Sequence, residues 1–331
     1  MNEATEPVDN LGGILSAVLV GALILAINFA AVPNAGTLAL GLFALAAAAT
    51  VAFVIRQRRA AAPLYDLHIA GRRVFWVAAA GGIIVFGSLM AAIFIGQQFL
   101  QNVLSYSTLA AGAAILPAAV LMVIVAPRSA ALIEARGSRF TLLLGYAFCF
   151  GAFVTMLLLW KDGAAYWTIA LGYSFMGVGV GLAGTPASRS LTGSVPVTKA
   201  GMASGTADLQ RDLGGAVVQS VLGALLTAGY AAAFAKAIAN NPNGDQISQD
   251  TQNALEKSFS SAANVAEQYP QYATQITGAA KESFVSGQTV AYLAGGLAVA
   301  AGAAIVWFFF PDKDDERALL AEYHAQDANP T

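Results

Sequence analysis

Three ionisable side chains lie inside one long, largely apolar stretch, residues 201–226 (GMASGTADLQRDLGGAVVQSVLGALL): Asp208, Arg211 and Asp212. Charge inside a bilayer is costly, and where it occurs it often marks a substrate or ion pathway. The set could therefore serve a transport pathway or a gate. Alternatively, the stretch forms a packing surface, with Arg211 reaching the membrane surface or pairing with Asp208 three residues earlier.

Helical periodicity divides this stretch into two sides. One side is small and polar, and it carries Gly201, Gly205, Asp208, Asp212, Gly215, Ala216, Gln219 and Gly223. The opposite side is apolar, and it carries Met202, Leu209, Leu213, Val217 and Val221. We expect the apolar side to face lipid, and the polar side to face protein or a water-filled cavity.

The composition defines the class of protein. Of 331 residues, 57% are hydrophobic and 11% are charged, whereas a soluble domain carries about 25% charge. The net charge of −2 and the lack of a basic cluster argue against nucleic-acid binding. With one cysteine, Cys149, and two distant histidines, no metal site is expected.

Eight apolar stretches are long enough to span a membrane, near residues 12–32, 36–55, 74–98, 108–127, 139–160, 164–186, 201–230 and 286–310. A turn at Pro33-Asn34 makes the first two a hairpin. Twelve of the 17 Lys and Arg residues lie in alternate loops and the C-terminal tail, on one side of the membrane. Basic loops stay in the cytoplasm, so both termini are predicted to be cytoplasmic. The fold class is an all-α polytopic membrane protein.

Further features within these stretches suggest packing or function. Glycines at Gly177, Gly179, Gly181 and Gly184 permit close helix packing or a hinge, and their GxGxxG spacing lacks the strand that a dinucleotide site needs. Pro117 is expected to kink its helix. The amides of Gln97, Gln98 and Gln101 could contact a solute or hydrogen-bond between helices. In the loop 127–139, Glu134 could pair with arginines and latch adjacent helices, or the loop is simply solvated.

No catalytic motif is present in the sequence. It lacks HExxH, GxSxG and Walker A patterns, so we expect neither an enzyme nor a bound cofactor. Without a nucleotide site, energy would have to come from an ion gradient.

Three segments together resemble the fourteen-span drug:proton antiporters of the major facilitator superfamily. They are residues 63–75 (PLYDL followed by RRVF), residues 99–117 (FLQNVLSYS, AG and LP), and the helix with Gly201, Gly205, Arg211, Gly214 and Gly215. The resemblance covers essentially the whole chain but only the second part of that architecture. It implies a cytoplasmic tail at 1–11, an inserted helix pair at 12–57 and a basic loop at 58–73. A six-helix bundle at 74–310 then follows, with an extracytoplasmic insert at 231–285 and a cytoplasmic tail at 311–331.

The resemblance implies part of a proton-coupled exporter of hydrophobic or cationic small molecules in the inner membrane. Its partners would be the lipid bilayer, the solute and protons. Because the N-terminal bundle of the family is missing, we expect no export by this chain alone. A separately encoded N-terminal half, or a second copy, would complete it. The alternative is a fragment or association subunit that does not transport.

Overall fold

The computed structural model describes residues 9–30, 32, 35–61, 63–242, 244 and 247–328. These residues form helices and contain no β-strand. The longer helices are α1 (Asn10–Ala30), α2 (Gly36–Arg59), α4 (Arg73–Gln98), α6 (Leu116–Arg136), α7 (Ser138–Leu159), α8 (Tyr166–Gly193), α9 (Ala200–Ala239), α12 (Ala273–Phe309) and α13 (Lys313–Ala328). The shorter ones are α3 (Leu67–Ala70), a π-helical turn (Phe99–Val103), α5 (Thr108–Ala113), α10 (Gln249–Lys257) and α11 (Phe259–Gln268).

Among the described residues, eight helical stretches have the length and composition to cross a membrane, with α5 and α6 forming one of them. The predicted class, an all-α polytopic membrane protein, is confirmed. The predicted hairpin is also present, since α1 packs along α2. Its Pro33-Asn34 turn lies outside the described residues.

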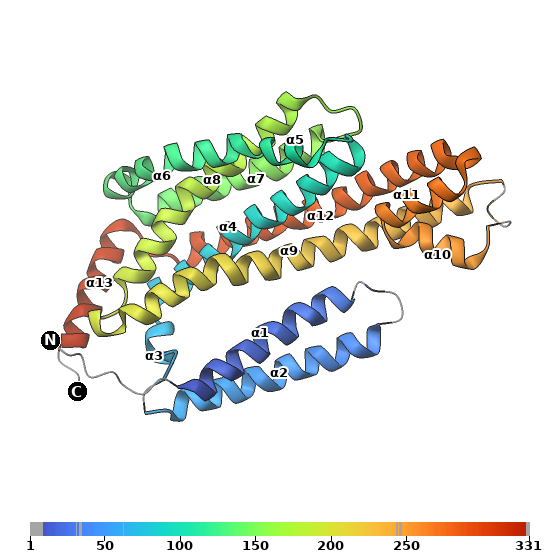
Figure 1. The fold of residues 1–331 in the computed structure, drawn as a ribbon. Coiled ribbons are helices and arrows are strands. Elements are labelled where there is room, and N and C mark those ends of the chain that lie inside the picture. Colours follow the sequence, from blue (N-terminus) through green and yellow to red (C-terminus); the bar gives the residue numbers. More distant parts are fainter. Residues whose placement is uncertain are drawn as a thin grey trace.

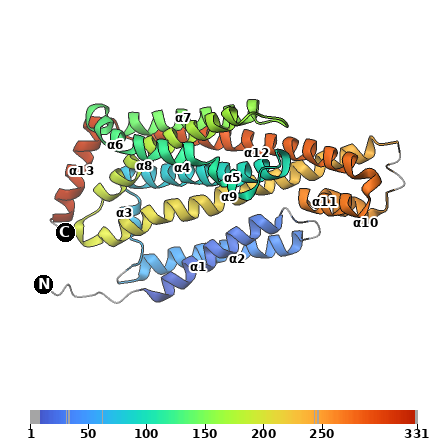
Figure 2. The same ribbon diagram turned by 45° about the horizontal axis from the view of Figure 1, so that its top comes forward.

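The helices form a bundle with a separate pair beside it (Figures 1 and 2). Helices α4, α6, α7, α8, α9 and α12 make the bundle, while α1 touches it along α9. The start of α1, the end of α2 and α13 lie at one end, which we call the basic end (Figure 1). Helices α10 and α11 lie at the opposite end, which we call the insert end (Figure 1).

Glycines bring the backbones of α4 and α9 into direct contact. A Cβ atom added at Gly214 would lie 2.5 Å from the carbonyl oxygen of Ile83. One added at Gly87 would lie 2.5 Å from the carbonyl oxygen of Gly214. Between membrane helices, association depends on van der Waals packing, which small residues allow by close approach.

The four glycines of α8 are also packed against neighbouring helices. Cβ atoms at these positions would meet a different residue in each case: Ala118 for Gly177, Cys149 for Gly179, Met122 for Gly181 and Phe86 for Gly184. Helix α8 therefore contacts α6, α7 and α4 through one glycine-rich segment.

Aromatic rings fill the core between the π-helical turn and α12. Trp160, which is 1% exposed, stacks on Phe99 with ring centroids 5.6 Å apart. Its indole Nε1 donates a hydrogen bond to the carbonyl of Thr168 at 3.1 Å. Gln288 of α12 donates to the carbonyl of Trp160 at 3.2 Å. These bonds satisfy polar groups that would otherwise be costly to bury.

The span expected to bend at Pro117 is interrupted just before this residue, between α5 and α6. Pro117 lies in the first turn of α6, after a break in the helix at residues 114–115. A first-turn residue needs no hydrogen bond from its backbone nitrogen, so proline starts a helix there without cost. The prolines inside helices are Pro127 and Pro186.

Helices extend into two segments that the sequence predicted to lie between spans. The expected loop at 127–139 is helical to Arg136, and α7 begins at Ser138. Helices also occupy both ends of the expected insert at 231–285, since α9 continues to Ala239 and α12 already begins at Ala273. A helix can extend beyond the hydrocarbon into water, so apolar length does not define where it ends.

A carboxylate fastens the hairpin at the basic end. Asp9 accepts hydrogen bonds from Gly12 N at 3.1 Å, Arg56 Nε at 3.0 Å and Gln57 Nε2 at 3.1 Å. The Gly12 bond is the largest influence lowering the pKa of Asp9, and the bonds from Arg56 and Gln57 lower it further against the opposing effect of burial. The ionised form therefore stabilises the junction of α1 and α2.

The contact between α4 and α9 predicts different effects for two glycines of α9. Gly214→Ala should destabilise the protein by about 1–3 kcal/mol, because a methyl group there meets backbone that cannot move aside. Gly205→Ala, with no atom within 4 Å of its Cβ, should be neutral or gain about 0.5–1 kcal/mol of helix propensity. Thermal unfolding of the purified variants measures this. Equal loss for both would contradict the packing.

The Asp9 bonds predict a dependence on pH. The pKa of Asp9 is lowered from 3.8, so its stabilisation is complete above that value and is lost as pH falls through the lowered pKa. Asp9→Asn should unfold at a lower temperature than the native chain at about pH 6, and the gap should narrow at about pH 3. A gap that stays constant between these pH values would show that Asp9 ionisation does not fasten the hairpin.

Candidate solute-facing site

The charged residues of α9 lie at its surface. Arg211 Nη1 is 3.9 Å from Asp208 Oδ1, and these side chains are 55% and 69% exposed. An exposed pair of this length contributes little stability. The guanidinium of Arg211 also lies 5.5 Å from the ring centre of Phe86 on α4. Asp212 is exposed as well, so the three groups carry a net charge of −1 on open surface.

The sides of α9 differ in part from the prediction. Gly201 and Gly205 face open space, since a Cβ atom at either would meet nothing within 4 Å. The polar side is therefore left uncovered over its first turns. In the first half of α9, the residues buried in the bundle are Ala203, Thr206, Gln210 and Gly214, which lie at or beside the predicted apolar side, and Gly215 of the predicted polar side. Gly215, which was predicted to lie on the polar side, is therefore buried at the edge of that side.

A row of large side chains on α4 borders the same surface. Phe86, Met90 and Phe94 follow at intervals of four residues and so share one side of the helix. A Cβ atom at Gly215 would lie 3.1 Å from Met90, and one at Gly223 would lie 3.1 Å from Phe94. The glycines of α9 thus make room for the side chains of α4.

We call this surface the α4–α9 face; it consists of Phe86, Met90, Phe94, Asp208, Arg211, Asp212, Gly215 and Gly223. Met90 and Phe94 are 39% and 38% exposed. Aromatic rings attract cations and apolar groups, and a thioether adapts to varied shapes. Sequence reasoning missed the α4 residues, although their i, i+4, i+8 spacing was a signal that could have found them.

A buried amide, also missed, supports this face from behind. Gln210 is fully buried, and its Nε2 donates a hydrogen bond to the carbonyl of Ala78 on α4 at 2.8 Å. Gly82 provides the space for the amide, since a Cβ atom there would collide with it. The bond fixes α9 against α4 one residue before Arg211.

The predicted glutamine cluster is only partly assembled. Gln97 Nε2 donates to the carbonyl of Ala111 at 2.8 Å, and Gln101 Nε2 donates to the carbonyl of Gln97 at 3.3 Å. These amides are bound to backbone beside the π-helical turn. Gln98 is half-buried and lies four residues beyond Phe94, where it continues the row on α4.

The predicted latch at Glu134 is replaced by one that involves α13. Glu134 makes no ion pair within the described residues; instead Arg139 pairs with Asp312. Lys313 Nζ donates to the carbonyl of Ala135 at 3.2 Å. A carboxylate from a distant segment supplies this partner, so local charge spacing could not reveal it.

A second contact with α13 involves a buried arginine. Arg72, whose side chain is 5% exposed, forms two hydrogen bonds with the Asp327 carboxylate, at 3.0 and 2.5 Å. It also donates to the carbonyl of Ser194 at 2.6 Å. Two-point pairing with a carboxylate is the geometry that favours arginine over lysine. The latch and this contact hold α13 across the basic end of the bundle.

Comparison with known proteins defines the family. Residues 8–219 match the family model described as Major Facilitator Superfamily. As the match covers more than half of the chain, the protein belongs to this superfamily.

Three relatives illustrate the relationship. The chain is 30% identical over 230 residues to "Multidrug resistance protein Stp" of Mycobacterium tuberculosis, covering 69% of this chain and 42% of Stp. It is 28% identical over 309 residues to "Multidrug efflux pump LfrA" of Mycolicibacterium smegmatis, covering 92% and 59%. It is 26% identical over 174 residues to "Quinolone resistance protein NorB" of Staphylococcus aureus, covering 52% and 37%. The chain therefore spans about half the length of the first two relatives.

Proposed function

We propose that this chain forms one half of a proton-coupled transporter that exports hydrophobic or cationic small molecules. The superfamily and the names of the relatives support transport of this type. The chemistry of the α4–α9 face supports the solute class. Two aromatic rings and a thioether lie beside a surface of net charge −1, which would attract a flat organic cation.

The observation that carries the proposal is the uncovered polar side of α9. A Cβ atom added at Gly201 or Gly205 would meet nothing within 4 Å, and the side chain of Asp208 is 69% exposed. Exposed charge of this kind is not compatible with contact to acyl chains, so a membrane helix turns it towards protein or water. We propose that a second bundle faces this side across a water-filled cavity. It would belong to a longer form of the protein, to a separate chain or to a second copy.

Two bundles around a shared cavity provide a mechanism for transport. One bundle rocks against the other, so that a site near the middle of the membrane opens to each side in turn. In this arrangement the α4–α9 face would contact the solute. Asp208 and Asp212 are the carboxylates of α9 where protons would be exchanged. Arg211, between them, would change partners as the cavity opens and closes.

The orientation and location complete the proposal. The basic end would lie in the cytoplasm, because Lys and Arg concentrate in cytoplasmic loops. This places α13 in the cytoplasm and the insert end on the outer side of the inner membrane.

The first prediction concerns the need for a second bundle. Everted membrane vesicles containing this chain alone should show no proton-driven movement of ethidium, a flat organic cation. Vesicles that also contain the portion of LfrA that this chain does not match should gain transport, and a protonophore should abolish it. Robust proton-driven transport by the purified chain alone in liposomes would contradict the proposal. Absence of transport in both preparations would favour the alternative, a membrane fragment that only associates.

A second prediction concerns Arg211, tested in the complete, transporting assembly. Arg211→Ala should abolish ethidium transport while membrane abundance stays unchanged. Abundance should not fall, because the exposed ion pair between Arg211 and Asp208 contributes little to the stability of the protein. The matched control is Arg128→Ala, since Arg128 is also exposed and donates a hydrogen bond within its own helix, to the carbonyl of Ile124. The control should keep transport. Equal loss of abundance and transport for Arg211→Ala would instead indicate a packing role.

A further inference from the structure

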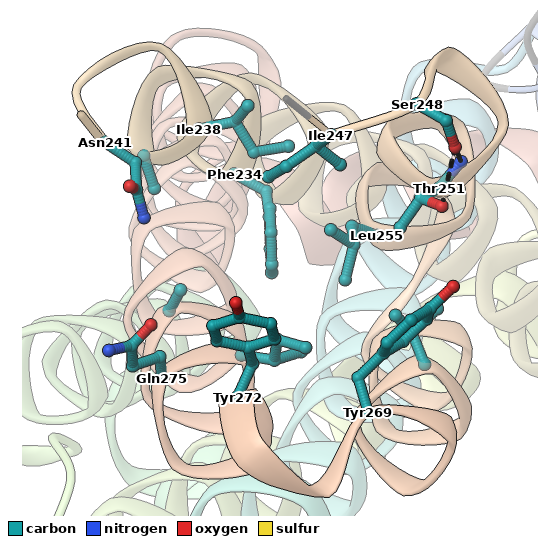
Figure 3. A pocket seen from close by; sticks show the side chains of 14 residues that line it. Phe234, Ile238, Asn241, Ile247, Ser248, Thr251, Leu255, Tyr269, Tyr272 and Gln275 are labelled. Carbon is teal, nitrogen blue, oxygen red and sulfur yellow. Dashed lines mark hydrogen bonds between the residues drawn. The ribbon is translucent and has the colours of Figure 1, made fainter. Parts of the chain in front are cut away.

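A second cavity, remote from the α4–α9 face, lies at the insert end. It has a volume of about 430 Å³ and lies between the outer ends of α9 and α12 and the short helices α10 and α11 (Figure 3). Small-molecule sites typically occupy about 300–1,000 Å³. We call this cavity the insert chamber.

The chamber has an apolar interior. Phe234, Ile238 and Leu255 are 3%, 9% and 4% exposed, and they form the wall on one side. Figure 3 shows the rings of Tyr269 and Tyr272 on the side opposite Phe234. The two tyrosines are 43% and 51% exposed, so they lie at the mouth. Tyrosine at this position offers a ligand both a ring face and a hydroxyl group.

Among the residues that the structure describes, the polar groups that line the chamber are uncharged. The fourteen residues that line it include no Asp, Glu, Lys, Arg or His. Gln275 supplies an amide, and Ser248 and Thr251 supply hydroxyl groups that lie 2.9 Å apart. Apolar walls with a few neutral polar groups are the usual lining of a small-molecule pocket. A charged ligand would lose water here without gaining a counter-ion.

Contacts between helices hold the walls of the insert chamber in place. The hydroxyl of Tyr230 on α9 donates to the carbonyl of Leu255 on α10 at 3.0 Å. Phe259 of α11 packs edge-on against Phe284 of α12, with ring centres 6.4 Å apart. These contacts fix α10 and α11 against the long helices. The space between them remains because α9 and α12 contribute small residues, Ala237 and Ala279, to the lining.

We propose that the insert chamber binds an uncharged, partly apolar organic molecule, at a site separate from the α4–α9 face. Its walls would hold a ring system, and the neutral amide and hydroxyl groups would orient a polar substituent. This binding requires neither a second bundle nor a proton gradient. It can therefore be measured on the chain alone, and its failure would leave the proposed transport function untouched.

Site-directed alkylation provides the test, because the native cysteine, Cys149, is fully buried. In lipid nanodiscs, Thr251→Cys places a thiol in the chamber lining, and Ser260→Cys places one on the exposed outside of α11. The probe is N-phenyl-1-naphthylamine, which is neutral. At about ten times its Kd, maleimide alkylation of Thr251→Cys should slow about tenfold, because mass action leaves about a tenth of the sites free. Alkylation of Ser260→Cys should not change.

Two controls test whether the probe protects the thiol by binding in the chamber or by dissolving in the bilayer. Anilinonaphthalene-8-sulfonate has the same ring skeleton with an added negative charge, and it should give no protection. Adding Ala279→Phe, or Ala237→Leu if the first variant does not fold, fills the chamber and should abolish protection by the neutral probe. Equal protection by both probes, protection of Ser260→Cys, or protection that survives a filled chamber would overturn the proposal.

Discussion

The close approach of helix backbones at glycine is the constraint on which the rest of this structure depends. In a bilayer, acyl chains surround apolar side chains as favourably as other helices do, so packing rather than water exclusion must hold a bundle together. Gly214 and Gly87 let α9 touch α4, and Gly287 contacts Gly229 where α12 touches α9. Because α4 and α9 meet at their backbones, Phe86, Met90 and Phe94 have no place between them. These side chains lie at the edge, where they form the α4–α9 face beside Arg211.

Ion pairs and buried hydrogen bonds stabilise the fold in addition to this packing. At the basic end, Arg72 holds Asp327, Arg139 holds Asp312 and Asp9 fastens α1 to α2. Arg139 and Asp312 are partly exposed, so little water is lost there. The side chains of Arg72 and Asp9 are 5% and 2% exposed, and each makes three hydrogen bonds in place of those to water. Within the bundle, neutral groups such as Gln210 make the polar contacts instead. A bundle held in this way can move as one rigid body, as a rocking mechanism requires.

The sequence was sufficient to predict the eight spans, the hairpin and the class of fold, because hydrophobic length is a strong constraint in a membrane. It was less informative about which side of α9 is buried. The two-sided pattern of Gly201, Asp208 and the opposite leucines predicted that the polar side faces protein or water, which stays a prediction, and it did not reveal that Gln210 is buried. The partner of that amide is a backbone carbonyl 132 residues away, and no local pattern encodes it. Likewise, the carboxylate that pairs with Arg139, Asp312, comes from another part of the chain, so the charges around Glu134 could not reveal it.

The sequence predicted only part of the α4–α9 face, because the residues from α9 stand out in the sequence and those from α4 do not. Arg211 is conspicuous in an apolar stretch, whereas Phe86, Met90 and Phe94 are ordinary residues in a membrane helix. Their significance comes from Gly215 and Gly223, which lie opposite them on α9. Only the pairing of α4 with α9 joins the two sets into one surface.

Thiol accessibility along α9 in a lipid bilayer tests the central claim, an open polar side on a packed helix, most directly. Single cysteines at Gly205 and Asp208 should react rapidly with a water-soluble maleimide. Cysteines at Ala203 and Thr206, which are 1% and 5% exposed, should be protected like Cys149. Alternation of this kind, with a helical period, is the expected result. Protection of Gly205 and Asp208 to the same degree as Ala203 would contradict the open side and, with it, the proposed cavity.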